Sequence, residues 1–514
     1  GDTDNWMWPR HTGDFSVFRV YAAADGTTPA DYSPENVPYR APVHLTVSAK
    51  GYKDGDFTMI MGFPGTTTRY MTTYEIDEML DVANPNRILI RGERQKILKE
   101  DMEASDRVRI QYSDKYANSS NYWKNSIGKS KAVRKLGIRD RRQEQEAAFP
   151  RWAQADPARS EYLRALTLIA ASKEVSVPLE SDRQVLREAI VSSVEVASIA
   201  AVLSRALPDL LSAEPLAAEE TIAAVYKDYN EPPDRKVAKR MIELTMEMVS
   251  PDNMPEFITT EVEGRFGGDV QAYVDWLYDN SIYANREKLE SYLAGGGELP
   301  ADDPALTVFN TTVAKHNGLV EQLREPAMQF AEGHKLYIKG LLEMDADGKH
   351  YPDANFTIRL TYGNVKSYSP ADAVDYDYFT TLTGVMEKED ELNPTEFTVP
   401  EKLKELYIEQ DYGPYADLSG LTRKEIRNGA KGHVNTCFIS TNDITGGNSG
   451  SPVLNDRGQL IGLAFDGNWD AMSGDVLFEP ELQRCINVDV RYVLFVIDKF
   501  AGAGHLLDEM TIEW

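Results

Sequence analysis

The pattern of hydrophobic and polar positions changes twice along the chain. Near the start, 17–21 is a short run of β-forming residues, and apolar residues alternate with polar ones in 43–47 and 57–63, which is the period of a β-strand. From about residue 74 to about residue 345, apolar residues recur every three or four positions and prolines separate the segments, as in a series of amphipathic helices. Alternation returns at 356–362. The sequence therefore predicts strands, a long helical region and then strands again.

The second β-rich region is too small to stand alone, so the simplest interpretation is one β core into which a helical domain is inserted. Alternation at both ends of the chain is typical of an antiparallel β-barrel. We expect the first part of the β core at residues 1–70, the inserted helical domain at 71–350, and the second part of the core with a C-terminal helix at 351–514. The predicted fold class is α+β.

A short polar loop in the last region is the strongest candidate for chemistry. Thr445–Pro452 reads T-G-G-N-S-G-S-P, and two apolar stretches joined by the polar turn Asn455–Gly458 follow it. This pattern predicts a sharp bend that presents the Ser449 hydroxyl ahead of a buried hairpin, as in trypsin-like serine peptidases. The backbone N–H groups of Gly447 and Ser449 are candidates for an oxyanion hole, which a side chain at position 447 would hinder. The alternative is an ordinary surface turn rich in Gly, Ser and Asn.

Composition and charge restrict the function classes. Hydrophobic residues make up 42% of the 514 residues, which is typical of a globular chain. The 82 acidic residues exceed the 55 basic ones, giving a net charge of −27, so binding to nucleic acid or to an anionic membrane surface is disfavoured. No apolar run reaches the roughly 18 residues of a membrane span. The two cysteines, Cys437 and Cys485, exclude a disulfide scaffold and a cysteine-rich metal site; they are either bridged to each other or buried as free thiols.

A reactive serine needs a histidine base that a carboxylate orients. None of the seven histidines lies in a persuasive setting; they are His11, His44, His316, His334, His350, His433 and His505. His433 shortly precedes Ser449, but the strand between them would have to fold straight back. Asp14, at the end of the cluster W-P-R-H-T-G-D, is the candidate carboxylate, and in trypsin-like enzymes the histidine comes before the aspartate. We therefore expect the base upstream of residue 1 and this chain to be a piece of a longer one.

Four segments together resemble the bacterial dipeptidyl aminopeptidase family that includes dipeptidyl-peptidases 7 and 11. They are G-D-T-D-N-W-M-W-P-R-H-T-G-D-F-S at 1–16, S-D-K-Y-A-N-S-S-N-Y-W-K-N at 113–125, T-G-G-N-S-G-S-P at 445–452 and F-D-G-N-W-D-A-M-S-G-D at 465–475. The resemblance runs essentially from end to end. It implies a chymotrypsin-like double β-barrel with an inserted all-helical domain that caps the active site, and the N-terminal barrel would be largely missing from this chain.

The resemblance also implies the catalytic chemistry. Ser449 matches the nucleophile and Asp14 matches the carboxylate of the triad. The implied reaction is acylation of Ser449, release of the shortened peptide and hydrolysis of the dipeptidyl ester. The family's catalytic histidine belongs to the N-terminal barrel. We therefore expect this chain to be inactive, or nearly so, by itself.

Further residues match the family's clamp for the free N-terminus of the substrate. Asn5 and Trp6 match residues that line its pocket, and Asp466 matches the carboxylate that pairs with the α-ammonium group. An asparagine of the stretch Asn118–Asn121 completes the clamp in the family, and we favour Asn121. A desolvated ammonium group needs such a fixed negative partner and polar neighbours.

Gly467, directly after Asp466, bears on specificity. Members that prefer Asp or Glu at the cleaved position resemble one another in carrying a larger residue there, often arginine, which pairs with the substrate carboxylate. Glycine has no charge, so the chain resembles the dipeptidyl-peptidase 7 side, which prefers apolar residues, and the net negative charge favours the same choice. The alternatives are an acidic-residue-specific dipeptidyl peptidase, a trypsin-like or HtrA-like endopeptidase, and a non-catalytic helical scaffold with a decayed peptidase core.

The family resemblance further implies peptide substrates with a free N-terminus, a homodimer, and a periplasmic or cell-surface location. We expect no cofactor and no metal ion. Nucleic acid and membrane insertion are not expected.

Overall fold

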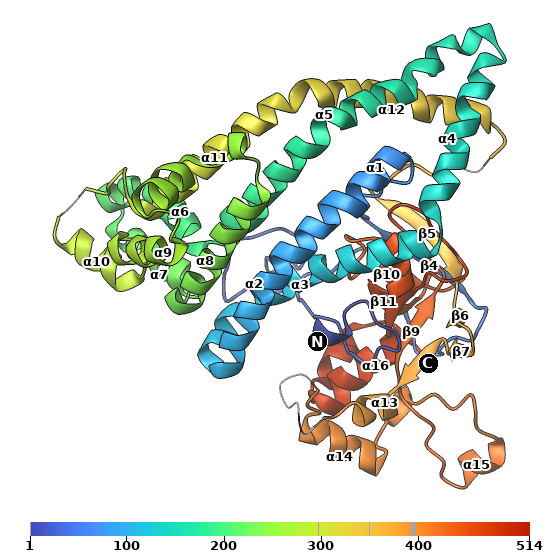
Figure 1. Cartoon of the computed structure of the whole chain (residues 1–514). Helices are drawn as coiled ribbons and strands as arrows, with labels where there is room; N and C mark the ends of the chain where they lie inside the picture. The colour runs from blue at the N-terminus through green and yellow to red at the C-terminus, as the bar shows by residue number, and fades with distance from the viewer. Residues whose placement is uncertain (1, 297, 349, 391, 393–396) are drawn as a thin grey trace. The chain divides into compact units, whose positions relative to one another are not determined.

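The computed structural model describes residues 2–296, 298–348, 350–390, 392 and 397–514, and it combines helices with antiparallel sheet (Figure 1). The chain forms two compact units. One contains Gly1–Arg69 together with Tyr351–Trp514, and the other is Tyr70–His350. The strands belong to the first unit and the long helices to the second.

The main sheet of the first unit is a mixture of short and medium strands. They are β3 (Val47–Ser48), β4 (Phe57–Gly62), β5 (Arg359–Asn364), β8 (Phe379–Thr381), β9 (Asn435–Ser440), β10 (Pro452–Leu454), β11 (Leu460–Gly467), β12 (Cys485–Asp489) and β13 (Ile512–Glu513). Two small sheets lie outside it, β1 (Tyr21–Ala22) with β2 (Val37–Pro38), and β6 (Tyr368–Ala371) with β7 (Val374–Tyr376). The expected hairpin after the Ser449 loop is confirmed as the antiparallel pair β10–β11.

Six strands of the main sheet close into a ring. They pair antiparallel in the order β5-β4-β10-β11-β12-β9. The two outer strands then meet, because Val365 bridges to Ser440 and the Thr441 N–H donates to the Asn364 carbonyl oxygen at 2.9 Å. When these six strands are numbered 1 to 6 in chain order, from β4 to β12, their order around the ring, starting at β4 and passing to β5, is 1-2-3-6-5-4.

The ring encloses an apolar core, and a second core lies beside it. Ile60, Phe438, Val453, Ile461, Ala464 and Cys485 are among the buried residues of the first. In the second, α16 (Val490–Phe495) packs with α13 (Leu382–Glu387) and α14 (Glu401–Glu409). Burial of this apolar surface is the main stabilising contribution to the unit.

The strands that the sequence predicts near the start are shorter in the structure, and one has an unexpected orientation. Of the two predicted segments 17–21 and 43–47, only the ends form strands, Tyr21–Ala22 (β1) and Val47–Ser48 (β3). Most of the other residues in these segments are exposed and belong to no strand. On β4, the side chains of Thr58 and Ile60 face the core. The alternating apolar set of β4 and β5 faces outward, and its members Phe57, Met61, Leu360 and Tyr362 are exposed.

The second unit is built from twelve α-helices among its described residues. They are α1 (Thr73–Glu78), α2 (Asn84–Ala104), α3 (Asp106–Lys135), α4 (Ile138–Gln154), α5 (Ala165–Val185), α6 (Glu195–Ala213), α7 (Pro215–Tyr226), α8 (Glu231–Met248), α9 (Val270–Asn280), α10 (Arg286–Ala294), α11 (Pro304–Gln322) and α12 (Arg324–Met344). The long helices α5 and α12 lie side by side (Figure 1). The π-helical segments η2 (Met79–Ala83) and η4 (Leu186–Val191) interrupt the regular helical period.

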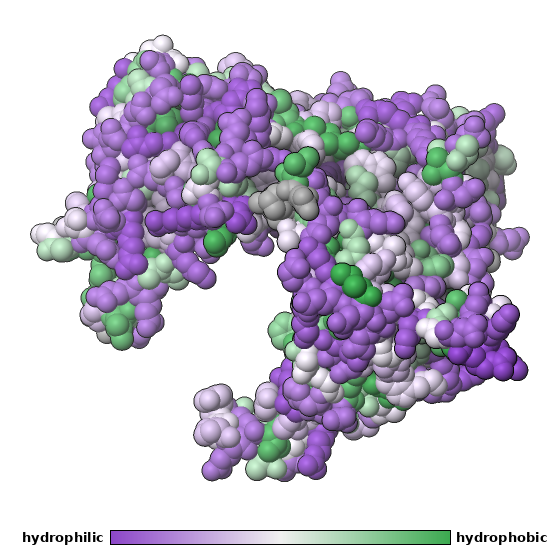
Figure 2. Space-filling model, turned by 90° about the horizontal axis from the view of Figure 1, so that it is seen from below, coloured by the Kyte–Doolittle hydropathy of each residue, from purple (hydrophilic) through white to green (hydrophobic). Residues whose placement is uncertain are grey.

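Within the described residues, no single helix is long and apolar enough to cross a membrane, although the bent pair 157–191 and 195–211 meets the length and composition criteria jointly. Val196, Ala200 and Leu203 of α6 are buried in the main core of the helical unit. The face of the molecule in Figure 2 is mostly hydrophilic, with small scattered apolar groups, as the net charge of −27 leads one to expect.

The two cysteines are free and buried. Cys437 lies on β9 and Cys485 on β12, where Val488 pairs with Cys437 and Ser440 pairs with Cys485. Burial raises the pKa of the Cys437 thiol to about 12 and also raises that of Cys485. Of the two arrangements that the sequence allowed, the structure has free thiols.

Candidate active site

The Ser449 loop joins β9 to β10 and is held at both ends by hydrogen bonds. The Asn448 N–H donates to the Thr445 carbonyl oxygen at 3.1 Å, and the Thr445 hydroxyl donates to Asp475 at 2.7 Å. After the serine, the Gly450 N–H donates to the Ala464 carbonyl oxygen on β11 at 2.7 Å. The loop is thus fixed to the hairpin that follows it, and Ser449 lies exposed at its tip.

Gly447 is required by the geometry of this loop. Its φ of +104° is strained for any residue with a side chain, and a Cβ there would lie 2.3 Å from the Phe63 carbonyl oxygen. The Gly65 N–H donates to the Gly446 carbonyl oxygen at 2.6 Å, which brings the chain after β4 against the loop. This close approach depends on the absence of a side chain at position 447.

Among the described residues, the proposed nucleophile and oxyanion-hole amides form no hydrogen bonds. In the described part of the chain, no hydrogen bond engages the Ser449 hydroxyl or the backbone N–H groups of Gly447 and Ser449. The hydroxyl and both amides are therefore available to a bound group. Likewise, no hydrogen bond links any described histidine to Ser449 or to Asp14.

Asp14 follows a segment that is anchored to the β unit. The Thr380 hydroxyl donates to the Arg10 carbonyl oxygen at 2.6 Å, and the Cys437 thiol donates to the Thr12 carbonyl oxygen at 3.2 Å. A Cβ on Gly13 would lie 2.9 Å from the Tyr492 ring, so the segment lies close against α16. Asp14 itself is exposed, and no hydrogen bond to another described residue holds its carboxylate.

Asp466 lies at the end of β11 and contacts the N-terminal segment. Its Oδ2 accepts a hydrogen bond from the Trp6 N–H at 2.9 Å, and its Oδ1 accepts one from the Gly467 N–H at 2.8 Å. A guanidinium nitrogen of Arg10, Nη2, forms an ion pair with the same Oδ2. Burial raises the pKa of Asp466, while the positive charge of Arg10 and the two N–H donors lower it.

Trp6 and Gly467 also meet directly. A Cβ on Gly467 would lie 3.4 Å from the Trp6 ring and 3.1 Å from the Cβ of Ala471. Glycine therefore lets the indole lie against the end of β11. Trp6 itself has a φ of +66°, a left-handed conformation that is uncommon for a bulky residue.

The asparagines of the expected clamp lie in different units. Asn5 directly follows the short helix η1 (Asp2–Asp4) of the β unit. Asn121 and its alternative Asn118 both lie exposed on α3 of the helical unit, three residues apart and so on neighbouring faces of that helix.

Arg10 is the residue that the sequence analysis missed. It is only 4% exposed, and its guanidinium also lies over the Phe465 ring, 5.2 Å from the ring centre. Its position in the polar and aromatic cluster W-P-R-H-T-G-D was the available signal. The neighbouring His11 is held neutral, because burial and the charge of Lys388 lower its pKa to about 4.

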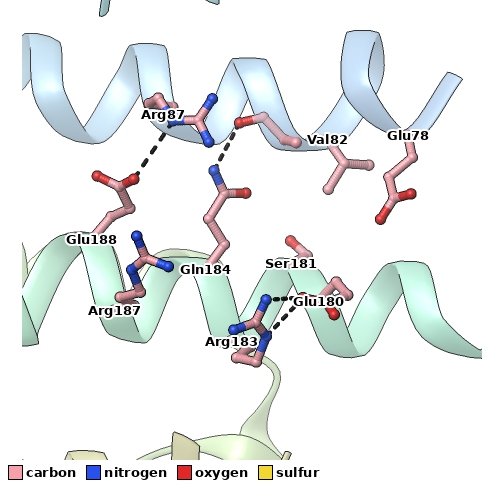
Figure 3. Close-up of a pocket in the computed structure, with 10 residues that line it drawn as sticks. Glu78, Val82, Arg87, Glu180, Ser181, Arg183, Gln184, Arg187 and Glu188 are labelled. Carbon is pink, nitrogen blue, oxygen red and sulfur yellow. Dashed lines mark hydrogen bonds and ion pairs between the residues drawn. The ribbon is translucent and has the colours of Figure 1, made fainter. Parts of the chain in front are cut away.

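A separate cavity of about 190 Å³ lies in the helical unit, between η2 and α2 on one side and α5 and η4 on the other (Figure 3). Its walls are held by contacts between the helices, Arg87 with Glu188 and Gln184 with a backbone carbonyl oxygen, and by an ion pair within α5. Arg87 lies 3.6 Å from Glu188, Arg183 pairs with Glu180, and Gln184 donates to a backbone carbonyl oxygen at 2.8 Å. None of the expected site residues lines it. Among the described residues, no group of three or more His, Cys, Asp or Glu side chains is arranged to hold a metal ion.

A family model described as Peptidase S46 matches residues 1–512, nearly the whole chain. This chain belongs to the peptidase S46 family. The family resemblance and the prediction of a serine-type dipeptidyl peptidase are thereby confirmed.

Two curated relatives show the range of the family. A dipeptidyl-peptidase 7 of Phocaeicola vulgatus is 48% identical over 524 residues, covering 100% of this chain and 70% of the relative. An Asp/Glu-specific dipeptidyl-peptidase of Porphyromonas gingivalis is 40% identical over 520 residues, covering 99% of this chain and 70% of the relative. Among solved structures, Porphyromonas endodontalis DPP11 in complex with the dipeptide Arg-Glu superposes with a TM-score of 0.88 at 35% identity, covering 100% of this chain and 72% of that one. These matches support the mixed helical and antiparallel-sheet fold.

Proposed function

We propose that this chain forms the nucleophile-bearing part of an exopeptidase that releases dipeptides from the free N-terminus of peptides. The observation that carries the proposal is the Ser449 loop of this S46-family chain. Its hydroxyl and two nearby backbone N–H groups make no hydrogen bond to any residue that the structure describes. Ser449 is the proposed nucleophile, and the amides of Gly447 and Ser449 are the proposed oxyanion hole.

The proposed architecture is a chymotrypsin-like barrel with a helical cap. The closed six-stranded ring supports the barrel, because its order 1-2-3-6-5-4 is that of two adjoining antiparallel motifs wrapped into one cylinder. We assign the role of the cap to the helical unit Tyr70–His350. A homodimer and a periplasmic or cell-surface location remain proposals from the family resemblance.

The proposed triad pairs Ser449 with Asp14 through a histidine that lies outside this sequence. Support comes from the described residues, among which no hydrogen bond joins a histidine to Ser449 or to Asp14. Without that base, the rate of acylation is expected to fall by several orders of magnitude.

The proposed substrate clamp consists of Asn5, Trp6 and Asp466 in the β unit, and the family resemblance alone adds Asn121. Asp466 supplies a buried carboxylate next to Trp6, which suits a desolvated ammonium group. Gly467 supplies neither charge nor bulk, so we propose an apolar residue at the cleaved position. A second candidate is a preference for Asp or Glu at the cleaved position, which the similarity to an Asp/Glu-specific dipeptidyl-peptidase favours.

Binding of dipeptides tests the clamp without requiring turnover. Isothermal titration of the chain with Leu-Leu and with N-acetyl-Leu-Leu is expected to show binding of the free dipeptide alone, because acetylation removes the ammonium charge. Equal affinity for both would refute the exopeptidase clamp and favour an endopeptidase. Titration with Leu-Asp decides the specificity, since tighter binding than Leu-Leu would establish the acidic alternative.

A further inference from the structure

The carboxylate assigned to ammonium recognition is not free in the structure. Three donors already bind Asp466: the Trp6 N–H, the Gly467 N–H and the Arg10 guanidinium. Its side chain is 7% exposed and that of Arg10 is 5% exposed. A carboxylate offers about four acceptor positions, so one is left for an incoming ammonium group. Arg10 also largely balances the negative charge of Asp466 that an incoming ammonium group would meet.

Arg10 connects this carboxylate to the turn that carries the other clamp residues. The same nitrogen, Nη2, donates both to Asp466 and to the Asp4 carbonyl oxygen. Asp4 begins a turn that the Met7 N–H closes by donating to the same carbonyl oxygen at 2.9 Å. Asn5 and Trp6 are the two central residues of this turn.

The turn needs external support because its backbone is strained. Trp6 has a φ of +66°, which costs a residue with a bulky side chain free energy that only fixed surroundings can offset. The surroundings are the bond from the Trp6 N–H to Asp466 and the bond from Arg10 to Asp4. Removing Arg10 would loosen the turn and leave a buried carboxylate without its counter-charge.

Resting on the function proposed above, we infer that Arg10 is a positioning residue for substrate recognition: it holds the Asp4–Met7 turn in its binding conformation and supplies the counter-charge of the buried Asp466 carboxylate in the proposed ammonium site. Arg10 does not touch the reacting atoms. Other charged groups nearby are paired with each other, since Lys388 forms an ion pair with Asp4 at 2.7 Å. Cys485 and His11 are held neutral by burial.

The first test measures the turn itself and needs no ligand. Hydrogen exchange of the Trp6 and Met7 amides, read by mass spectrometry on short peptic fragments, is compared between the wild-type chain and Arg10→Gln. We expect exchange to accelerate by about tenfold or more in the variant. Arg19→Gln is the matched control, because Arg19 lies in the same N-terminal region but forms a half-exposed ion pair with Glu509. Unchanged exchange of the turn in a folded Arg10→Gln chain would overturn the inference.

The second test measures dipeptide affinity as a function of pH. With Leu-Leu as the probe, Arg10→Gln is expected to weaken binding by about 30-fold at pH 7 and to move the acidic limb of the affinity profile upward by about one pH unit, because Asp466 would then protonate more readily. Arg10→Lys is expected to restore the position of the limb, since it keeps the positive charge. A merely structural role would weaken binding at all pH values and leave the limb in place, which would contradict the inference.

The two tests separate this inference from the proposed function. If Asp466→Asn leaves Leu-Leu binding unchanged, or if the chain does not distinguish Leu-Leu from N-acetyl-Leu-Leu, the proposed clamp fails, while the exchange experiment still decides the role of Arg10 in the turn. If Asp466→Asn abolishes binding and Arg10→Gln does not alter it, the clamp stands and the role of Arg10 is refuted. Circular dichroism establishes that each variant is folded, and Arg10→Met, which also removes the charge, carries both tests if Arg10→Gln does not fold.

Discussion

Replacing Asp234 by alanine is expected to destabilise the helical unit strongly. Asp234 lies on α8, is 1% exposed and accepts hydrogen bonds from the Glu195 N–H at 2.9 Å and the Val196 N–H at 2.8 Å. These amides belong to the first turn of α6, so a side chain of one helix caps the N-terminus of another. The hydroxyls of Tyr278 and Tyr229 donate to the same carboxylate at 2.7 and 3.3 Å.

The size of the loss in stability follows from the number of hydrogen-bond donors that Asp234→Ala leaves without an acceptor. Each buried donor without an acceptor costs roughly 1–3 kcal/mol. Two backbone amides and the Tyr278 hydroxyl lose their acceptor in Asp234→Ala, whereas Tyr229 keeps a bond to the Ala284 carbonyl oxygen at 3.1 Å. We therefore expect the free energy of unfolding to fall by about 3 kcal/mol or more.

The same carboxylate makes stability depend on pH. Burial, and secondarily the repulsion of Glu195, raise the pKa of Asp234 to about 7, whereas an unfolded aspartate titrates near 4. Between these values the folded chain holds a proton that the unfolded chain has lost, so the contribution of Asp234 to the free energy of unfolding decreases as the pH rises. Over about three pH units the decrease amounts to at most about 4 kcal/mol. Asp234→Asn cannot titrate and is expected to lose less stability between pH 5 and pH 8 than the wild type.

Urea unfolding of the whole chain, followed by circular dichroism at pH 5 and at pH 8, measures both effects. Asp302→Asn serves as the control, since Asp302 is exposed and lies in the same unit. Wild-type stability in Asp234→Ala would refute the capping argument. If the free energy of unfolding of the wild type, relative to that of Asp234→Asn, increases with pH, the sign assigned to the titration is wrong.

Three further substitutions test the candidate site. Ser449→Ala is expected to leave Leu-Leu affinity unchanged but to lower kcat by about a thousandfold or more in any preparation that cleaves peptides, and activity that survives would assign the nucleophile elsewhere. Gly447→Ala places a Cβ 2.3 Å from the Phe63 carbonyl oxygen at a φ of +104°, so thermal unfolding should show a loss of about 1–3 kcal/mol; an unchanged Tm would contradict the loop geometry. Gly467→Arg is expected to shift relative affinity from Leu-Leu towards Leu-Asp by about 10–100-fold, despite some crowding against Ala471, and an unaltered ratio would show that position 467 does not set specificity.

Local patterns were sufficient to predict several features of the site. The run T-G-G-N-S-G-S-P and its polar turn predicted the loop and the β10–β11 hairpin, because glycine conformations and turn chemistry depend on neighbouring residues. Helical periodicity likewise predicted the helical region, since the spacing of apolar residues is a local property.

The sequence could not predict which partners these elements find. Arg10 and Asp466 form a buried ion pair although 456 positions separate them. Nothing in the local sequence of either residue identifies the other, because such a contact requires β11 and the N-terminal segment to be brought together by the fold. The free state of the two thiols had the same origin, since it depends on the register of β9 and β12.

By itself, the sequence determined the Ser449 loop with its hairpin, the helical region and the family of this chain. Only the tertiary structure decided which face of a strand is inside. The apolar set Phe57, Met59 and Met61 alternates as clearly as a buried face does, yet Thr58 and Ile60 face the core. The physical reason is that a period of two defines two faces of a strand but does not say which one the closed ring encloses. That choice depends on the register with β5 and β10, which long-range pairing alone fixes.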